Sequence, residues 1–213
     1  ESVAFTRYTL RLREDLHFQP HPAFALDTAG QPRYLFDTAA AGGQYRQIPD
    51  FPHTGDRPVH ANDYAYAIKR LADPLNASPM LGFMSQYIVG MKAFSESVAK
   101  LPRDEWLNLD DHPMTGLAVL DERTLSITIT GRYPQFVFWL AMPFFSPIAP
   151  EVDRFYHNPG FADRNLTLDW WPVGSGPYML TEFLERTRAS DYAPRAAPPC
   201  AECAYRDRCA AKP

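Results

Sequence analysis

The stretch 58–80, PVHANDYAYAIKRLADPLNASPM, constrains the fold most, because it contains a helix together with the signals that begin and end it. Asn62 and Asp63 offer side-chain acceptors and negative charge where the first N–H groups of a helix have no partners. Apolar residues follow at helical spacing, and Pro74 ends the pattern after a basic pair in the last turn. We therefore expect a helix of about three turns and then a tight turn that directs Met80 away from the helix.

Two other stretches alternate between apolar and polar residues, which is typical of half-buried strands. Residues 5–13, FTRYTLRLR, form the first. Residues 116–133 contain two alternating runs joined by Asp121-Glu122-Arg123-Thr124, which predicts a hairpin. The expected inward side chains of its second strand are Leu125, Ile127 and Ile129, and the expected outward ones are Ser126, Thr128 and Thr130.

Two further stretches predict helices. Aromatic and methionine residues recur at near-helical steps in residues 81–101, so we expect a helix there, although Gly82 and Gly90 weaken the pattern. Residues 134–140 predict a short helix with proline near its first turn, where a missing N–H costs nothing.

The composition excludes several classes of protein. Hydrophobic residues make up 46% of the chain and aromatic residues 14%, as in a globular protein rather than a disordered one. The formal net charge is −4, with 21 basic and 25 acidic residues intermixed, which argues against a nucleic-acid surface. No apolar run of about 18 residues is present, so we expect no membrane-spanning helix. The first residues do not resemble a signal peptide, and because the chain starts at Glu1 without Met we expect its natural N-terminus to be missing.

A long segment, residues 19–57, is rich in proline, alanine, glycine and aspartate and shows no periodic pattern. Loops of this length are uncommon and are often functional or partly mobile. His17, His21 and His53 lie in or beside it, but none is spaced from another ligand type as metal-binding residues are. Ordinary loop histidines are the better interpretation.

The last residues, 186–213, contain no Val, Ile, Leu, Met, Phe or Trp and cannot bury enough apolar area to offset the entropy of ordering. We expect this tail to be disordered or non-native in origin, through a reading-frame slip or a truncated gene model. Cys200, Cys203 and Cys209 have a metal-like spacing but are one ligand short of a four-ligand zinc site. A zinc or iron–sulfur knuckle is the alternative; otherwise we expect no metal and no cofactor.

Four blocks of the chain, in order, resemble one family. KRLADPLNASP resembles the KRL-DP-x-x-ASP signature of the dipeptide- and oligopeptide-binding proteins of bacterial ABC importers, the extracellular solute-binding proteins of family 5. LREDLHF, AVLDERTLSITIT and PVGSGPYML match further blocks of the same family. The usual Asp-Gly turn after the first block is absent, and residues 19–57 stand in its place. The two glycines around Ser175 predict a tight backbone path, followed by a strand at 178–183.

The resemblance implies a mixed α/β architecture in which residues 1–185 form part of the N-terminal lobe of a two-lobed, type II periplasmic-binding-protein fold. It implies a periplasmic or cell-surface protein that captures a peptide or another small solute and delivers it to an inner-membrane ABC permease. Such proteins bind by closing about a hinge and carry out no chemistry on the solute. We expect Ser78, Pro79 and Met80 to border the cleft, and the truncated chain to be unable to bind tightly alone.

Two functions of other classes remain as alternatives. One is a small hydrolase, in which carboxylates or histidines act as acid and base; its candidate residues are Asp63, Asp73, Asp110, Asp111 and the histidines. Ser175 does not have the spacing of a G-x-S-x-G nucleophile, and a Walker phosphate loop is also absent. The other is a free-standing interaction module that uses the edge of the hairpin and the aromatic surface.

Overall fold

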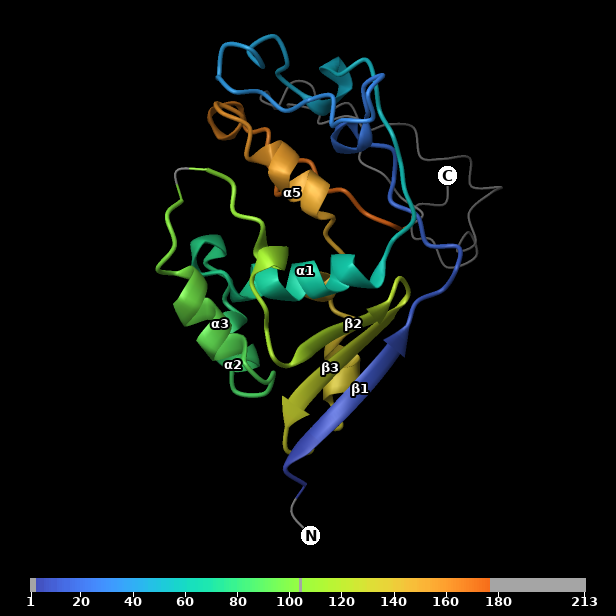
Figure 1. Ribbon diagram of the computed structural model, residues 1–213, viewed down its shortest axis with the longest axis vertical. Coiled ribbons are helices and arrows are strands. Elements are labelled where there is room, and N and C mark those ends of the chain that lie inside the picture. The colour runs from blue at the N-terminus through green and yellow to red at the C-terminus, as the bar shows by residue number, and fades with distance from the viewer. Residues whose placement is uncertain (1–2, 104, 177–213) are drawn as a thin grey trace, which may run out of the picture. The chain divides into compact units, whose positions relative to one another are not determined.

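The computed structural model describes residues 3–103 and 105–176. Figure 1 shows a small sheet with helices around it and, beyond α1, a long irregular segment beside α5. The strands and α-helices are β1 (Phe5–Arg11), α1 (Ala61–Ala72), α2 (Leu81–Met84), α3 (Met91–Val98), β2 (Leu117–Asp121), β3 (Thr124–Thr130), α4 (Phe136–Trp139) and α5 (Pro150–Tyr156). The 3-10 turns are η1 (Pro22–Phe24), η2 (Ile48–Asp50), η3 (Pro74–Asn76), η4 (Leu109–Asp111), η5 (Pro143–Phe145) and η6 (Ala162–Arg164).

The three strands form an antiparallel sheet in the order β1-β3-β2. Ile127 on the central strand lies opposite Tyr8 on one side and Leu117 on the other. The hairpin turns between Asp121 and Thr124, and the Asp121 carboxylate accepts the Arg123 backbone N–H at 2.8 Å. The predicted hairpin is therefore confirmed. The first strand is also confirmed, although it ends at Arg11, two residues earlier than the alternation suggested.

The inward side chains of β3 are the predicted ones: Leu125, Ile127 and Ile129 are all buried. The other face departs from the prediction at Ser126, which was expected to point outward and is only 5% exposed. Ser126 is small and lies on the central strand between Thr9 and Ala118, so the neighbouring strands shield it.

Helix α1 confirms the prediction for the most constrained stretch of the sequence. It has 12 residues, and the Asp63 carboxylate accepts the His60 backbone N–H at 2.7 Å at its start. Asp73 then takes an extended conformation, and Pro74 opens η3. The apolar face of α1 packs on β2, β3 and α3, and the helix also contacts η3, which leads into the turn at 77–80.

The single helix expected over residues 81–101 is wrong; the structure has two short helices, α2 and α3. Between them the chain adds to the sheet, because Val89 N–H donates to Thr128 O at 3.1 Å and Thr130 N–H donates to Tyr87 O at 2.8 Å. Gly90 then turns with φ at 76°, and a Cβ there would lie 2.2 Å from Thr115 Oγ1. Pairing with a distant strand thus interrupts the local helical pattern.

The apolar interior has two parts. The sheet core contains the inward face of β3 and its neighbours, with the buried members Ala61, Ala65, Tyr66, Ile68, Leu71, Ala72, Met84, Ile88, Met91, Phe94, Val98, Leu109, Met114, Leu125, Ile127, Ile129, Phe136, Trp139 and Phe145. The insertion core joins residues 18–59 to α5 and the segment after it, with the buried members Phe18, Ala23, Phe24, Ala25, Tyr34, Phe51, Val59, Ala149, Val152, Phe155, Tyr156, Phe161, Leu166, Trp171 and Val173. The long proline-rich segment is therefore packed, although its only helical pieces are η1 and η2.

The mixed α/β class is confirmed by this architecture. Several expectations lie outside the described residues: the strand at 178–183, the boundary at 185 and the cysteine-containing tail 186–213. They stay predictions, as does the division into a partial lobe and a tail. In the described part of the chain, no helix is both long and apolar enough to cross a membrane.

Candidate functional site

The candidate residues Ser78, Pro79 and Met80 form a single turn between η3 and α2. Ala77 adopts the left-handed conformation at φ 45°, and Met80 N–H donates to Ser78 Oγ at 3.3 Å. Pro79 is exposed, whereas Ser78 is half-buried. Met80 is also half-buried and packs against the sheet core, so its side chain does not project freely from the turn as expected. Whether these residues border a ligand stays a prediction.

An open hollow of about 460 Å³ lies near this turn, although Ser78, Pro79 and Met80 do not line it. On the α1 side it is lined by the residues just before the turn, Leu75 and Asn76, and Leu75 is 66% exposed. The opposite wall runs from the end of α5 to residue 169. The hollow is thus open and partly apolar, and it adjoins the chain just before the candidate turn.

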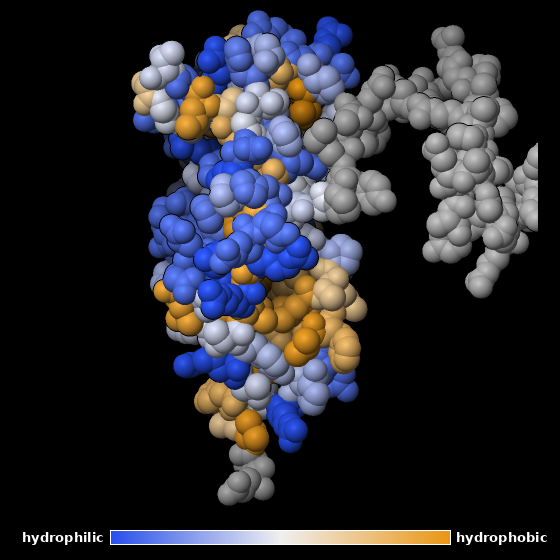
Figure 2. All heavy atoms as spheres, turned by 90° about the vertical axis from the view of Figure 1, so that its right-hand side faces the viewer, coloured by the Kyte–Doolittle hydropathy of each residue, from blue (hydrophilic) through white to orange (hydrophobic). Residues whose placement is uncertain are grey.

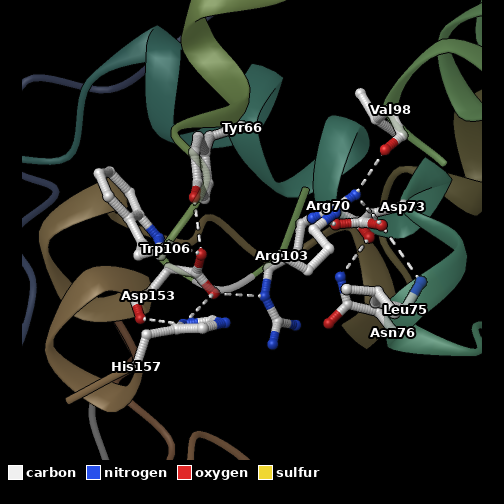
Figure 3. A network of polar contacts seen from close by, with 10 residues as sticks. All are labelled: Tyr66, Arg70, Asp73, Leu75, Asn76, Val98, Arg103, Trp106, Asp153 and His157. Atoms are coloured by element: carbon white, nitrogen blue, oxygen red, sulfur yellow. Dashed lines mark hydrogen bonds and ion pairs between the residues drawn. The ribbon is translucent and has the colours of Figure 1, made fainter. Parts of the chain in front are cut away.

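The basic and acidic residues of the KRLADP motif bind partners from distant parts of the chain (Figure 3). Arg70 Nε donates to Asp153 at 2.8 Å, and Asp73 accepts two bonds from Arg103, both at 2.9 Å. Lys69, which is 8% exposed, reaches Asp110 at 3.5 Å. The motif therefore fixes the end of α1 against α5 and against the segment that follows α3.

Asp153 is the centre of this network. Besides Arg70, its carboxylate accepts the Tyr66 hydroxyl at 2.7 Å and the Trp106 indole N–H at 2.9 Å. Burial works against the charge on Asp153, but Arg70, His157 and these two hydrogen bonds outweigh it and hold the pKa of the carboxyl below its usual value. Burial, with the nearby Asp153 charge, raises the pKa of Tyr66. Asp153 therefore stays ionised and accepts hydrogen bonds, and does not supply protons.

A second charged cluster joins the start of α1 to the start of α5. The Arg57 guanidinium donates to both oxygens of Asp63, at 2.9 and 2.7 Å, and to both oxygens of Glu151, at 2.9 and 2.8 Å. It also lies over the rings of Phe18 and Phe24. Burial opposes the charge, but the two carboxylates prevail and raise the pKa of Arg57. Because the guanidinium is planar, its two bidentate contacts fix the positions of the Asp63 and Glu151 carboxylates relative to each other.

The carboxylates considered for a hydrolase are used in these contacts. Asp63, Asp73 and Asp110 each accept a salt bridge, and Asp111 accepts the Asn108 side-chain amide at 3.2 Å. The described residues hold no group of three or more His, Cys, Asp or Glu side chains placed to bind a metal ion.

His21, one of the three loop histidines, is buried at 2% exposure. Its Nδ1 accepts the Ala23 N–H at 3.1 Å, so its Nε2 carries the proton and donates to the Tyr156 hydroxyl at 2.9 Å. That hydroxyl in turn donates to Trp171 O at 2.6 Å. Burial lowers the pKa of His21 to about 3, so the ring is neutral and structural.

The glycines around Ser175 do not have the tight backbone path that the sequence suggested. Neither Gly174 nor Gly176 has a positive φ, and within the described residues a Cβ at either position would meet nothing closer than 3.8 Å. The segment is instead held by Gln19, whose backbone N–H donates to Gly174 O at 2.9 Å and whose side chain donates to Pro172 O at 2.9 Å. The loop end therefore lies beside the start of the long insertion.

The sequence matches one family of known proteins over about two thirds of the chain. Residues 51–192 match the model of "Bacterial extracellular solute-binding proteins, family 5 Middle". The dipeptide-binding protein DppE of Bacillus subtilis is 30% identical over 130 residues, which cover 61% of this chain and 21% of that protein. The periplasmic oligopeptide-binding protein OppA of Salmonella typhimurium is 26% identical over 138 residues, which cover 62% and 21%. The chain thus spans about a fifth of the length of these relatives. A solved substrate-binding domain of an oligopeptide ABC transporter from Bacillus anthracis aligns over 84% of this chain and 26% of its own, with 20% identity and a TM-score of 0.49.

Proposed function

Because the chain belongs to family 5 of the bacterial extracellular solute-binding proteins, we propose that it is part of the substrate-binding component of an ABC importer and that it helps to capture peptides or similar solutes. The observation that carries the proposal is the family match over residues 51–192, which includes α1, the candidate turn and the hairpin. The two relatives are described as binding dipeptides and oligopeptides, which supports a peptide as the solute. The proposed setting is the periplasm or the cell surface, and the proposed partner is an inner-membrane permease.

Ser78, Pro79 and Met80 are the residues we propose at the border of the cleft. They lie at the end of an anchored helix, since Arg70 and Asp73 tie the last turn of α1 to two other segments. A turn held in this way can present backbone and side-chain groups to a ligand with little loss of entropy on binding. The hollow lined by Leu75 and Asn76, just before the turn, has the concave form that ligand sites require.

Capture is proposed to need a second lobe, because the chain spans about a fifth of its relatives. Exposed apolar side chains support the proposal that part of this surface packs against another lobe. Phe5 is 62% exposed, Val137 52%, Phe138 73% and Met142 43%. Figure 2 shows apolar side chains gathered on one face of the half of the molecule that carries the N-terminal strand. Monomeric proteins seldom leave large contiguous apolar patches in water.

Site-specific crosslinking tests the proposal without requiring tight binding. A photoreactive phenylalanine analogue replaces Met80 or, as the matched control, Leu120 on β2, which is 59% exposed. After irradiation with a labelled tripeptide, we expect several-fold more label at position 80 than at position 120, and mass spectrometry should recover the free peptide unchanged. Equal labelling would remove Met80 from the proposed cleft. Cleaved peptide would instead favour the hydrolase.

A further inference from the structure

A second concave site lies away from the candidate turn. It is a pocket of about 150 Å³ between the insertion, the connection at 101–112 and the first turns of α5. Its walls include the buried side chains of Pro22, Ala23, Tyr34 and Phe155. The KRLADP motif does not line it, whereas residues of the insertion at 19–57 do, so the site depends on that insertion.

The volume of the pocket limits what can enter it. A cavity of about 150 Å³ holds a single benzene ring, whereas sites for drug-sized molecules occupy about 300–1,000 Å³. The buried wall is mainly aromatic and aliphatic, with Tyr34 and Phe155 as its rings. The pocket therefore suits one apolar side chain of the size of leucine or phenylalanine, and it excludes a peptide.

One positively charged side chain at the rim is available to an anion. The Arg154 guanidinium is exposed and lies over the Trp106 ring at 5.5 Å from its centroid. It forms no ion pair with any described carboxylate. Stacking engages the flat face of a guanidinium and leaves its N–H edge free for the two oxygens of a carboxylate.

Two carboxylates line the same small pocket. Asp110 accepts the Asn62 side-chain amide at 2.6 Å and Lys69 at 3.5 Å, and Glu151 accepts Arg57. An ionised carboxylate has about four lone-pair positions, so each can accept a further donor. The rim therefore combines an anion-binding group and cation-binding groups around an apolar interior.

We propose that this pocket binds a free α-amino acid with an apolar side chain, at a site separate from the proposed peptide cleft. Arg154 binds the α-carboxylate, Asp110 and Glu151 attract the α-ammonium group, and the side chain packs against Tyr34 and Phe155. The neighbouring α-carboxylate and α-ammonium of a free amino acid match the mixed charge of the rim. A residue inside a peptide carries neither charge, and a peptide terminus carries only one of them.

Titration of the purified full chain tests this assignment, with L-leucine and L-phenylalanine as probes and ligand-observed NMR or calorimetry as the readout. We expect saturable binding of both. Arg154→Gln should weaken binding at least tenfold, whereas Arg132→Gln, an exposed arginine that does not line the pocket, should leave it unchanged. Circular dichroism should show that both variants remain folded.

Changes to the ligand separate the two charged contacts without altering the protein. N-acetyl-L-leucine lacks the ammonium group and L-leucinamide lacks the carboxylate, and each should bind at least tenfold more weakly than L-leucine. The proposal is overturned if leucine and phenylalanine show no saturable binding, if Arg154→Gln and Arg132→Gln bind alike, or if N-acetyl-L-leucine binds as well as leucine.

Discussion

The sheet core and the insertion core are both well buried but are built from different kinds of sequence. In the sheet core, the apolar residues of β3 and α1 recur at strand and helix spacing. The insertion core draws aromatic rings from a segment without periodicity, such as Tyr34 and Phe51, whose centroids lie 4.9 Å apart. Each aromatic side chain buries about 150–250 Å². A few well-placed rings can therefore form a core where regular secondary structure is nearly absent.

The junction between the two cores is polar. On the side of α1, Tyr66 and Arg70 bind Asp153 of α5, while Arg57 binds Asp63 and Glu151. Salt bridges of this kind are directional, so they set the relative position of α1 and α5 more strictly than apolar packing would. Periodic sequence thus builds one core, aromatic content builds the other, and a few charged residues align them.

The largest predicted effect comes from breaking this junction. Asp153→Asn removes the charge opposite Arg70 and weakens the acceptor for Tyr66 and Trp106, so we expect a loss of about 3 kcal/mol in the free energy of unfolding. Urea denaturation at pH 7 measures it. Asp163→Asn, at an exposed position in η6, should change stability by less than about 0.5 kcal/mol. Equal stability of the two variants would mean that the junction contributes little.

The predicted effect of intermediate size is a dependence of folding stability on pH that comes from the insertion core. The pKa of His21 in the insertion core is about 3, below the ordinary value of 6.5, so only the unfolded state takes up this proton as the pH falls through 6.5. Stability is therefore full above pH 6.5 and falls by roughly 1.4 kcal/mol per pH unit below it, or about 2 kcal/mol by pH 5. The lowered pKa of Asp153 acts at a lower pH, because a carboxylate of depressed pKa loses its contribution only below its ordinary range near 4.

Denaturation curves at pH 6.5 and 5 measure this effect. His21→Asn keeps an acceptor near the Ala23 N–H but cannot titrate, so its stability should be nearly constant over this range. His53→Asn, at an exposed position, should keep the full dependence. An unchanged slope in the His21 variant would contradict the assignment.

The smallest predicted effect lies outside both cores, at the turn before the candidate site. Ala77 has φ at 45°, a strained conformation for a residue with a Cβ. Ala77→Gly relieves this strain but makes the unfolded chain more flexible, so we expect a net gain of about 0.5 kcal/mol. Ala93→Gly in α3, at an exposed helical position, should instead lose about 1 kcal/mol. Thermal denaturation compares the two, and losses in both would show that Ala77 is unstrained.

Elements whose signals are local could be predicted from the sequence. Asp63 and Pro74 mark the two ends of α1, and the alternation around Ile127 marks β3. The break at Gly90 could not be predicted in the same way, because it depends on Val89 pairing with Thr128, 39 residues later in the chain. The packing of the insertion was missed for a similar reason, since its rings find partners only in three dimensions.

In the candidate site too, the features with local sequence signals could be predicted and those that depend on distant residues could not. The turn at Ser78, Pro79 and Met80 follows from nearby residues and was predicted, although the burial of Met80 was not. The charged partners of the motif were missed, because Arg70 and Asp153 lie 83 residues apart and Asp73 and Arg103 lie 30 apart. Basic residues in the last turn of a helix already have a local explanation, so the sequence carried no signal for these distant carboxylates.

The two ends of the insertion lie next to each other. His17 and Pro58 form an antiparallel bridge, and Phe18 N–H donates to Arg57 O at 3.0 Å. Because the chain leaves and returns at one point, its length between these residues can change without displacing either flank, and doubling a loop costs only about 0.6 kcal/mol in closure entropy. The rings that this stretch gives to the insertion core must stay in place, but its exposed turn at residues 26–31 can be lengthened or replaced, so that evolution or a protein engineer can give the same scaffold new surface chemistry there.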